Sequence, residues 1–332
     1  MDKVSLYKGK KVLIIRFSAI GDIVLTSPIV RTLKKSGYAV HFLVKTKFKS
    51  AIENNRYLDK LYCIEESSLK ESLLSENYAQ IIDLQNNLES FKLRRGLSSN
   101  TNIVNKENLK KLLLVRTGVD LLKKEHIVER YFKTIKALGI ENDHQGLDFH
   151  IATKKPLSID KIAFSLDQKY IAWVIGASYP KKMLPVEHIV KVCESLNIPI
   201  VLVGGPADGE RGQIISSTKK VNNVFNLCGK LSLQESAFIV KKAALVLTND
   251  TGLMHIASAF KKDIISFWGC TKPSIGMYPY LPGKNSMEMV SPVNKGPCSK
   301  LGNRCKSDSE GCIQHINTDN IISQINKILV GV

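Results

Sequence analysis

Residues 243–259, AALVLTNDTGLMHIASA, decide the fold, because they describe a buried strand that runs through a short polar turn directly into a helix. Asp250 or Thr251 can cap this helix, and Gly252 allows a ligand or another backbone segment to approach closely. Unpaired amides at the start of a helix favour a phosphate, which would lie beside His255 on the first turn. By itself the stretch fits an ordinary capped helix with a structural histidine more often than it fits a ligand site.

The same alternation of strand and helix recurs in both halves of the chain. Hydrophobic runs of strand length lie at 11–16 and 39–44 in the first half, and at 170–175, 200–205 and 263–268 in the second. Helical patterns separate these runs, which is typical of parallel sheets covered by helices on both faces. We therefore predict an α/β protein with two doubly wound domains, and we expect ligands beyond the carboxyl ends of the strands.

The composition is that of a globular protein of about two domains, with 332 residues, of which 44% are hydrophobic and 23% are charged. No run approaches the roughly 20 apolar residues of a membrane-spanning helix. The opening residues lead into a strand rather than a signal peptide. We therefore expect a cytoplasmic protein.

The net charge is +18, and much of the excess lies between Lys92 and Lys136, where a basic helical pattern runs from about Lys106 to Leu138. Such an excess predicts an acidic partner, either an anionic membrane surface or a phosphorylated lipid, unless it is only a solvated face. A nucleic-acid partner is not expected, since the chain has no helix-turn-helix signature, zinc-finger spacing or aromatic RNA-binding motif.

The seven cysteines fall into two groups. Four lie in apolar surroundings and are expected to be reduced, buried thiols: Cys63, Cys193, Cys228 and Cys270. Cys298, Cys305 and Cys312 recur at intervals of seven residues in a polar loop that also contains His315. This spacing differs from the close Cys-x2-Cys pairs of zinc sites, so we expect no bound metal; a metal held by the three cysteines and a disulfide within the loop are the alternatives.

The loop 16–22, RFSAIGD, follows the first strand. A dinucleotide fold requires Gly-x-Gly-x-x-Gly at this position, and only Gly21 is present, which disfavours an NAD-dependent enzyme. Asp22 is then a single carboxylate at a strand end. It is either a helix cap or a catalytic base, and its position alone favours the cap.

Two loops of the second half have the residues of a nucleotide site. Loop 176–185, GASYPKKMLP, combines Ser178 with two lysines, and a lysine can stabilise a departing diphosphate, although a solvated surface turn explains the loop equally well. Loop 204–211, GGPADGER, has glycines that permit close approach and Asp208, which can hold ribose hydroxyls. Together with the turn before His255, these loops predict a nucleotide in the second domain.

Four motifs carry a resemblance to a known family: VLIIRFSAIGDIVLTSP at 12–28, IVLVGG at 200–205, LCGKLSLQE at 227–235 and TNDTGLMHIASA at 248–259. Over nearly its whole length the chain resembles the family 9 glycosyltransferases, whose best known members are the ADP-heptose:lipopolysaccharide heptosyltransferases. The resemblance implies a GT-B fold, in which two Rossmann-like domains face each other across a cleft. Sugar transfer with inversion is also implied.

The implied domains are an acceptor-binding domain at 1–155, a nucleotide-sugar-binding domain at 156–317, and a terminal helix at 318–332 that stays with the second domain or crosses back to the first. Asp22 matches the family's catalytic base and Lys182 its phosphate-contacting lysine, with Lys181 as a possible substitute. The implied donor contacts are Ser178, Lys181, Asp208, Leu231, Asp250, Thr251, Gly252 and His255. The expected acceptor contacts are Arg16 and Arg130, the latter on charge grounds.

The resemblance implies transfer of heptose from ADP-heptose to a phosphorylated lipopolysaccharide core, without a metal or other cofactor. The protein is then expected to be a monomer associated with the inner face of the inner membrane. Heptosyltransferases often have two threonines where this chain has Ala177 and Ser178, and an aromatic residue near Leu184. Another nucleotide sugar, a non-catalytic nucleotide-sugar or glycolipid-binding protein, and a hydrolase or epimerase acting on a nucleotide sugar are the alternatives.

Overall fold

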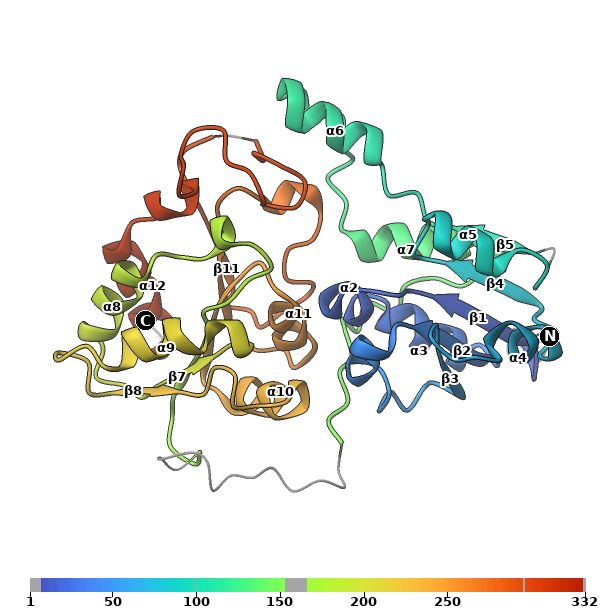
Figure 1. The fold of residues 1–332 in the computed structure, drawn as a ribbon, viewed down its shortest axis with the longest axis horizontal. Helices are drawn as coiled ribbons and strands as arrows, with labels where there is room; N and C mark the ends of the chain where they lie inside the picture. Colours follow the sequence, from blue (N-terminus) through green and yellow to red (C-terminus); the bar gives the residue numbers. More distant parts are fainter. Residues whose placement is uncertain (1–6, 99, 153–165, 295, 331–332) are drawn as a thin grey trace. The chain divides into compact units, whose positions relative to one another are not determined.

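The computed structural model describes residues 7–98, 100–152, 166–294 and 296–330. The chain divides into two compact units, one of Met1–Lys106 with Glu125–His150 and one of Glu107–Lys124 with Ile151–Val332 (Figure 1). The expected boundary after residue 155 falls outside the described residues. Residues 107–124, which the sequence placed in the first domain, cluster instead with the second.

The first unit contains a five-stranded parallel sheet of order β3-β2-β1-β4-β5. Its strands are β1 (Lys11–Ile15), β2 (Ala39–Val44), β3 (Lys60–Cys63), β4 (Gln80–Asp83) and β5 (Thr101–Ile103). Its helices are α2 (Ile20–Val24), α3 (Ser27–Lys35), α4 (Leu69–Ser75), α5 (Leu88–Arg94) and α7 (Ile127–Ile135), with 3-10 turns η1 (Thr46–Ala51) and η2 (Lys136–Leu138). The strand order reverses between β1 and β4, so the loops that follow these two strands form the natural ligand position of the unit.

The second unit contains a six-stranded parallel sheet of order β11-β10-β9-β6-β7-β8. Its strands are β6 (Ile171–Val174), β7 (Ile200–Val203), β8 (Val224–Asn226), β9 (Leu245–Asn249), β10 (Ile264–Trp268) and β11 (Met287–Val290). Its helices are α6 (Asn108–Thr117), α8 (Val186–Glu194), α9 (Gly209–Ser216), α10 (Leu233–Lys242), α11 (Gly252–Ala259) and α12 (Thr318–Val330), with 3-10 turns η4 (Pro180–Lys182), η5 (Pro206–Asp208), η6 (Pro273–Ile275) and η7 (Cys312–His315). Here the order reverses between β6 and β9, which places the loops with the lysines and with Asp250 side by side.

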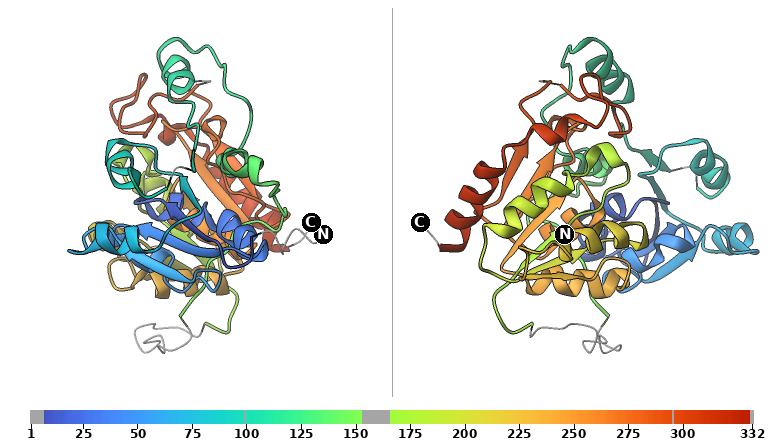
Figure 2. Two further views of the ribbon diagram at one scale, coloured as in Figure 1. Left: turned by 90° about the vertical axis from the view of Figure 1, so that its right-hand side faces the viewer. Right: turned by 60° about the vertical axis from the view of Figure 1, so that its left-hand side comes forward.

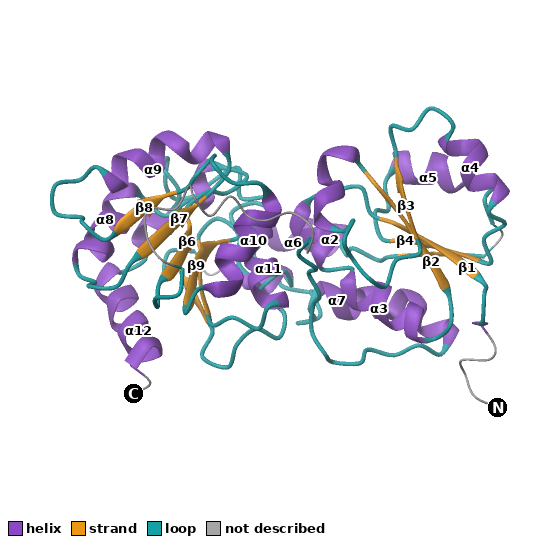
Figure 3. Cartoon of the chain, turned by 90° about the horizontal axis from the view of Figure 1, so that it is seen from below, coloured by secondary structure: helices purple, strands orange, loops and turns teal. Residues whose placement is uncertain are grey.

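Helices cover both faces of the second sheet (Figure 3). Alternate residues of β6 point to opposite faces, so Trp173 packs with α8, α9 and α12, whereas Ala172 packs with α10 and α11. These central strands are hydrophobic without interruption because neither face meets water. The predicted doubly wound α/β architecture is therefore confirmed in both units.

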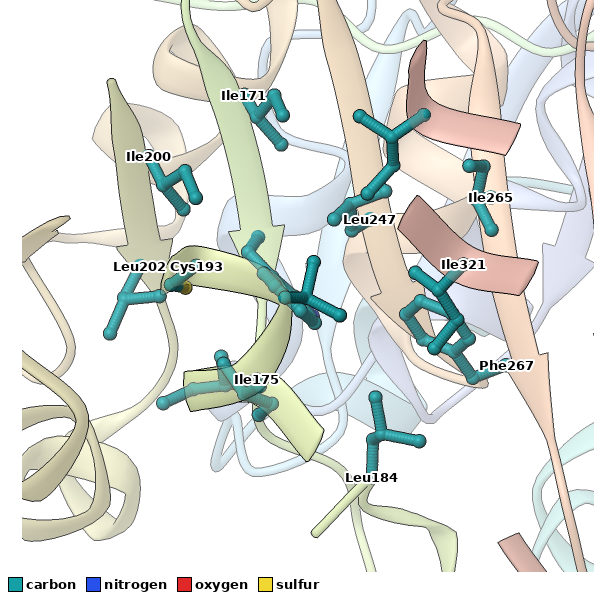
Figure 4. Close-up of a cluster of buried hydrophobic side chains, with 14 of the residues drawn as sticks. Ile171, Ile175, Leu184, Cys193, Ile200, Leu202, Leu247, Ile265, Phe267 and Ile321 are labelled. Atoms are coloured by element: carbon teal, nitrogen blue, oxygen red, sulfur yellow. The ribbon is translucent and has the colours of Figure 1, made fainter. Parts of the chain in front are cut away.

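The C-terminal helix α12 belongs to the second unit. Ile321 and Ile325 are fully buried, and Ile321 lies against Phe267 and the rest of this core (Figure 4). The helix runs beside α8, as the right-hand view of Figure 2 shows. Among the described residues, no helix combines the length and the apolar character needed to cross a membrane.

The basic helical pattern from Lys106 to Leu138 is wrong as a single helix. Helix α6 ends at Gly118, which has a φ of 79°, a left-handed conformation that glycine adopts without strain. A new helix, α7, begins after His126, whose side chain accepts a hydrogen bond from the amide of Val128 at 3.2 Å. The basic residues are therefore divided between the two units.

Candidate active site

The turn after β9 holds its shape through its own side chains. Thr251 caps α11, since its Oγ1 accepts a hydrogen bond from the amide of Met254 at 3.4 Å. The side-chain Nδ2 of Asn249 donates to the carbonyl oxygens of Ile175 and Gly176 at 3.0 and 3.2 Å. The turn is therefore joined to the loop after β6. Because Thr251 supplies the cap, the carboxylate of Asp250 is left for another contact.

That contact is with a lysine from the loop after β6. Lys182 Nζ lies 2.6 Å from Asp250 Oδ2, and the two side chains are only 10% and 17% exposed. Thr271, just beyond β10, donates its hydroxyl to the same carboxylate oxygen at 3.0 Å. An ammonium group has three donor hydrogens, so a lysine held by one carboxylate can still bind phosphate oxygens. Lys182 therefore sits at the strand switch point as a fixed, largely buried positive charge.

The neighbouring candidates occupy the same edge of the sheet. Lys181 and Ser178 are more exposed than Lys182 in the same loop, which favours Lys182 as the fixed cation. His255 is buried on the first turn of α11. Leu231 is half-buried against the α10 and α11 face of the core, immediately before the cap residue of α10.

Asp208 joins two of the loops. Its Oδ2 accepts a hydrogen bond from the amide of Gly205 at 2.8 Å, within the turn that follows β7. A Cβ atom at Gly176 would come within 2.1 Å of the same oxygen, so a larger residue there would displace the Asp208 carboxylate. The loops after β6 and β7 therefore meet at this carboxylate.

In the first unit, Asp22 both caps a helix and forms an ion pair. Its Oδ2 accepts a hydrogen bond from the amide of Ala19 at 3.3 Å, at the start of α2. Its Oδ1 lies 2.6 Å from Arg16 Nη2. Burial opposes the charged form of Arg16, but the Asp22 carboxylate outweighs it and the pKa of the guanidinium is raised. The Arg16 guanidinium and the Ala19 amide therefore hold the Asp22 carboxylate at the start of α2.

Neither arginine proposed for the acceptor presents an open side chain. Arg16 donates through Nη1 to the carbonyl of Leu84 at 2.6 Å and through Nε to that of Ser18 at 3.0 Å, so its guanidinium positions Asp22. Arg130 is buried on α7, and its Nη2 donates to the carbonyl of Glu125 at 3.2 Å. Both side chains support the framework around them.

The contacts of three residues in the strand-end loops of the two units were not anticipated from the sequence: Thr271 and Asn249 in the second unit and Asp83 in the first. Buried Asp83 ends β4 beside β1 and accepts a hydrogen bond from Ser90 Oγ at 2.8 Å, with Arg94 Nε at 3.2 Å. All three residues lie at or just beyond the carboxyl end of a strand. A polar residue at that position is the signal that would have identified them.

The clustered cysteines are closer together than their spacing suggests. The sulfur atoms of Cys298, Cys305 and Cys312 are joined by that of Cys270, and the four lie within 4.8 Å of one another. The expectation that Cys270 is separate from the three loop cysteines is therefore wrong. His315, in contrast, lies 3.0 Å from Asp308 through its Nε2 atom.

The two parallel-sheet units, with a lysine–aspartate pair at the strand switch point of the second, have the architecture of a GT-B glycosyltransferase. The chain belongs to glycosyltransferase family 9 (heptosyltransferase), whose family model matches residues 67–307. It is 24% identical over 349 residues to lipopolysaccharide heptosyltransferase 1 of Campylobacter coli, covering 96% of this chain and 98% of that protein.

Solved structures show the same fold. The glycosyl transferase family 9 protein of Veillonella parvula superposes with a TM-score of 0.78 at 18% identity, covering 98% of each chain. The Escherichia coli heptosyltransferase WaaC with ADP superposes with a TM-score of 0.71 at 21% identity, covering 96% of this chain and 99% of that one. The protein is therefore an enzyme of the glycosyltransferase class.

Proposed function

We propose that the protein is an inverting heptosyltransferase that moves heptose from ADP-heptose to a phosphorylated lipopolysaccharide core. The observation that carries this proposal is the largely buried Lys182–Asp250 pair at the switch point of the second sheet. The names of the relatives support the choice of sugar, since the Campylobacter coli protein is a lipopolysaccharide heptosyltransferase. One Escherichia coli structure of the same fold contains ADP-2-deoxy-2-fluoro heptose.

In this proposal, Lys182 stabilises the departing diphosphate. Negative charge grows on the phosphate oxygens as the bond to the sugar breaks, and a fixed cation costs no reorganisation at that moment. Asp250 and Thr271 hold Lys182 in position, and the first amides of α11 add to the positive field. The lysine and the amides together supply the positive charge that the leaving group requires, so the proposed reaction is metal-independent and uses no cofactor.

The remaining donor contacts belong to the loops at the carboxyl edge of the second sheet. We assign the diphosphate and sugar contacts to Ser178, Lys181, Thr251, Gly252 and His255, the ribose to Asp208, and the adenine to Leu231. The glycines at 176 and 204 support the assignment of Asp208, because their lack of a side chain leaves room for the Asp208 carboxylate between the loops after β6 and β7.

Asp22 is the proposed base. It removes the proton of the acceptor hydroxyl as that oxygen attacks the anomeric carbon from the side opposite the diphosphate. Arg16 pairs with the carboxylate and fixes its orientation. The same carboxylate thus caps α2 in the resting protein and accepts a proton during transfer.

We propose that the protein works as a monomer in the cytoplasm, at the inner face of the inner membrane where its acidic acceptor resides. Helix α6 and the segment after it support membrane contact, because Leu109 is 83% exposed beside basic residues and Leu112 lies one turn away on the same side. A Leu109→Ser, Leu112→Ser variant is expected to bind phosphatidylglycerol vesicles more weakly in sedimentation. Equal binding by the wild type and the variant would contradict a membrane contact through α6.

Calorimetric titration with ADP, UDP and GDP tests the donor. Selective binding of ADP, lost in Asp250→Ala, supports the proposal. Preference for UDP or GDP would retain a family 9 transferase that uses another nucleotide sugar. Tight ADP binding without turnover on any core acceptor would instead indicate a non-catalytic binding protein.

A further inference from the structure

Four cysteine sulfurs converge on one point of the second unit. Cys270 follows β10, while Cys298, Cys305 and Cys312 lie between β11 and α12, and all four Sγ atoms are within 4.8 Å of one another. Cys270, Cys298 and Cys312 are buried and Cys305 is partly buried. The backbone also brings the two segments together, since the amide of Cys298 donates to the carbonyl of Cys270 at 2.9 Å.

The spacing of the sulfur atoms is that of ligands around a single ion. The Sγ separations are 3.8 Å from Cys298 to Cys305, 3.9 Å from Cys298 to Cys312 and 3.8 Å from Cys312 to Cys270. A regular tetrahedron of sulfurs about 2.3 Å from a central zinc ion has edges of about 3.8 Å. A disulfide requires about 2.05 Å between two sulfurs, so these separations fit coordination and not a disulfide.

The surroundings suit a cluster of thiolates. Asn294 Nδ2 lies 3.4 Å from Cys298 Sγ, a contact that stabilises a negatively charged sulfur. Lys272, two residues after Cys270, is buried, and its Nζ donates to the carbonyl of Ser291 at 3.0 Å, which joins the segment after β10 to the segment after β11.

The long loop has little regular secondary structure of its own. Between residues 291 and 317, leaving aside residue 295, the only regular element that the structure describes is the short turn η7. A loop of this length without its own secondary structure is uncommon in a compact domain. A bound ion would join Cys270 to three positions of the loop and so stabilise the fold of this segment.

This loop also forms a wall of the proposed donor site. Gly302 has a φ of 78°, and a Cβ atom there would lie 2.5 Å from Lys182 Cγ. A Cβ atom at Gly311 would lie 3.0 Å from the carbonyl oxygen of Lys181. On the other side, Thr271 follows Cys270 directly and donates to Asp250. The cysteine cluster therefore supports both partners of the Lys182–Asp250 pair.

We propose that Cys270, Cys298, Cys305 and Cys312 bind one metal ion of the class that takes tetrahedral sulfur ligands, Zn²⁺ or iron. Each thiol releases its proton to solvent as its sulfur binds the ion. The ion has a structural role, because four protein ligands complete its coordination, and it holds the loop against Lys182. The second role rests on the proposed function.

Elemental analysis of the full-length protein, purified without metal-affinity chromatography, tests the site. We expect about one zinc or iron ion per chain, and the same measurement shows which of the two metals is bound. Cys305→Ser should lose it, whereas Cys63→Ser, a buried cysteine of the other unit, should keep it. Protein produced in cobalt-supplemented medium should show thiolate-to-cobalt charge-transfer absorption, which tests the site even if a variant fails to fold. Less than about one-tenth equivalent of metal together with no such absorption would overturn the proposal, as would two or more iron atoms with labile sulfide.

Nucleotide titration tests the support of Lys182. ADP binding to Cys305→Ser should weaken about tenfold or more, since displacing a positioned group by about 1 Å can cost up to about 10²-fold. If Cys305→Ser loses the metal but binds ADP as tightly as the wild type, the proposed support of Lys182 is wrong, whereas the proposed metal site is retained. Metal at one equivalent in a wild-type protein that binds no ADP would count against the proposed function and leave the site intact.

Discussion

Replacing Lys182 by methionine removes the charge and keeps the length of the side chain. Lys182 Nζ is 2.6 Å from Asp250 Oδ2, and both side chains are mostly buried. Two unit charges about 4 Å apart interact by about 4 kcal/mol at an effective dielectric constant of 20, and loss of one comparable charge-stabilising group costs about 3 kcal/mol. We therefore expect kcat to fall about 10²-fold. Affinity for ADP should fall as well, because Asp250 is left unpaired beside the phosphates.

Single-turnover kinetics with ADP-heptose measure this loss apart from product release. Lys181→Met is the matched control, since it removes a neighbouring, more exposed charge of the same loop. Because Lys181 is a proposed phosphate contact in a more exposed position, its loss should lower kcat by about fivefold at most, less than the loss of Lys182. A Lys182→Met variant that folds normally and retains wild-type kcat would refute the assignment, and a larger loss in Lys181→Met would transfer the role to Lys181.

The other predictions concern the base, the loop contact and the framework. Asp22→Asn should lower transfer about 10²–10⁴-fold with unchanged ADP affinity in calorimetry; retained transfer would exclude Asp22 as base. Gly176→Ala should cost about 1–3 kcal/mol in urea unfolding, because its Cβ would lie 2.1 Å from Asp208 Oδ2; unchanged stability would contradict that contact. Arg31→Met should cost about 3 kcal/mol, since buried Arg31 donates to Asp143 at 2.7 and 2.9 Å. Burial opposes ionisation of Asp143, but Arg31 outweighs it and lowers the pKa to about 2. Because this stabilisation is present above the unfolded-state pKa of about 3.9, wild-type stability should fall between about pH 4 and 2, and the variant should show a smaller change.

The sequence predicted the sheets well because their strands are hydrophobic on both faces. The runs at 11–16, 39–44 and 200–205 appear as β1, β2 and β7 with small shifts at their ends. Position after such strands pointed to Asp22, to the two lysines at 181 and 182 and to the turn with Asp250, and the resemblance to family 9 then selected Lys182; the roles of these residues stay predictions.

The spacing of residues in the sequence did not predict contacts between distant segments. Cys270 is 28 residues from Cys298, and only the pairing of β10 with its neighbours brings it to the loop. The burial of Arg16 and Arg130 was likewise not predicted, because it depends on contacts such as that of Arg16 with the Leu84 carbonyl; their acceptor roles stay predictions. The choice of Thr251 over Asp250 as the cap was also left open, because both residue types cap helices well.

The most direct test of the proposed function is an assay of heptose transfer from ADP-heptose to a core acceptor. Purified protein is incubated with ADP-heptose and a lipopolysaccharide core that lacks heptose. The mass of the product is measured by mass spectrometry, and the released ADP is quantified in the same reaction. For the wild type we expect one added heptose for each ADP released. For Asp22→Asn we expect no added heptose and no released ADP. Release of ADP without a heavier core, or transfer only from a UDP- or GDP-linked sugar, would contradict the proposed function.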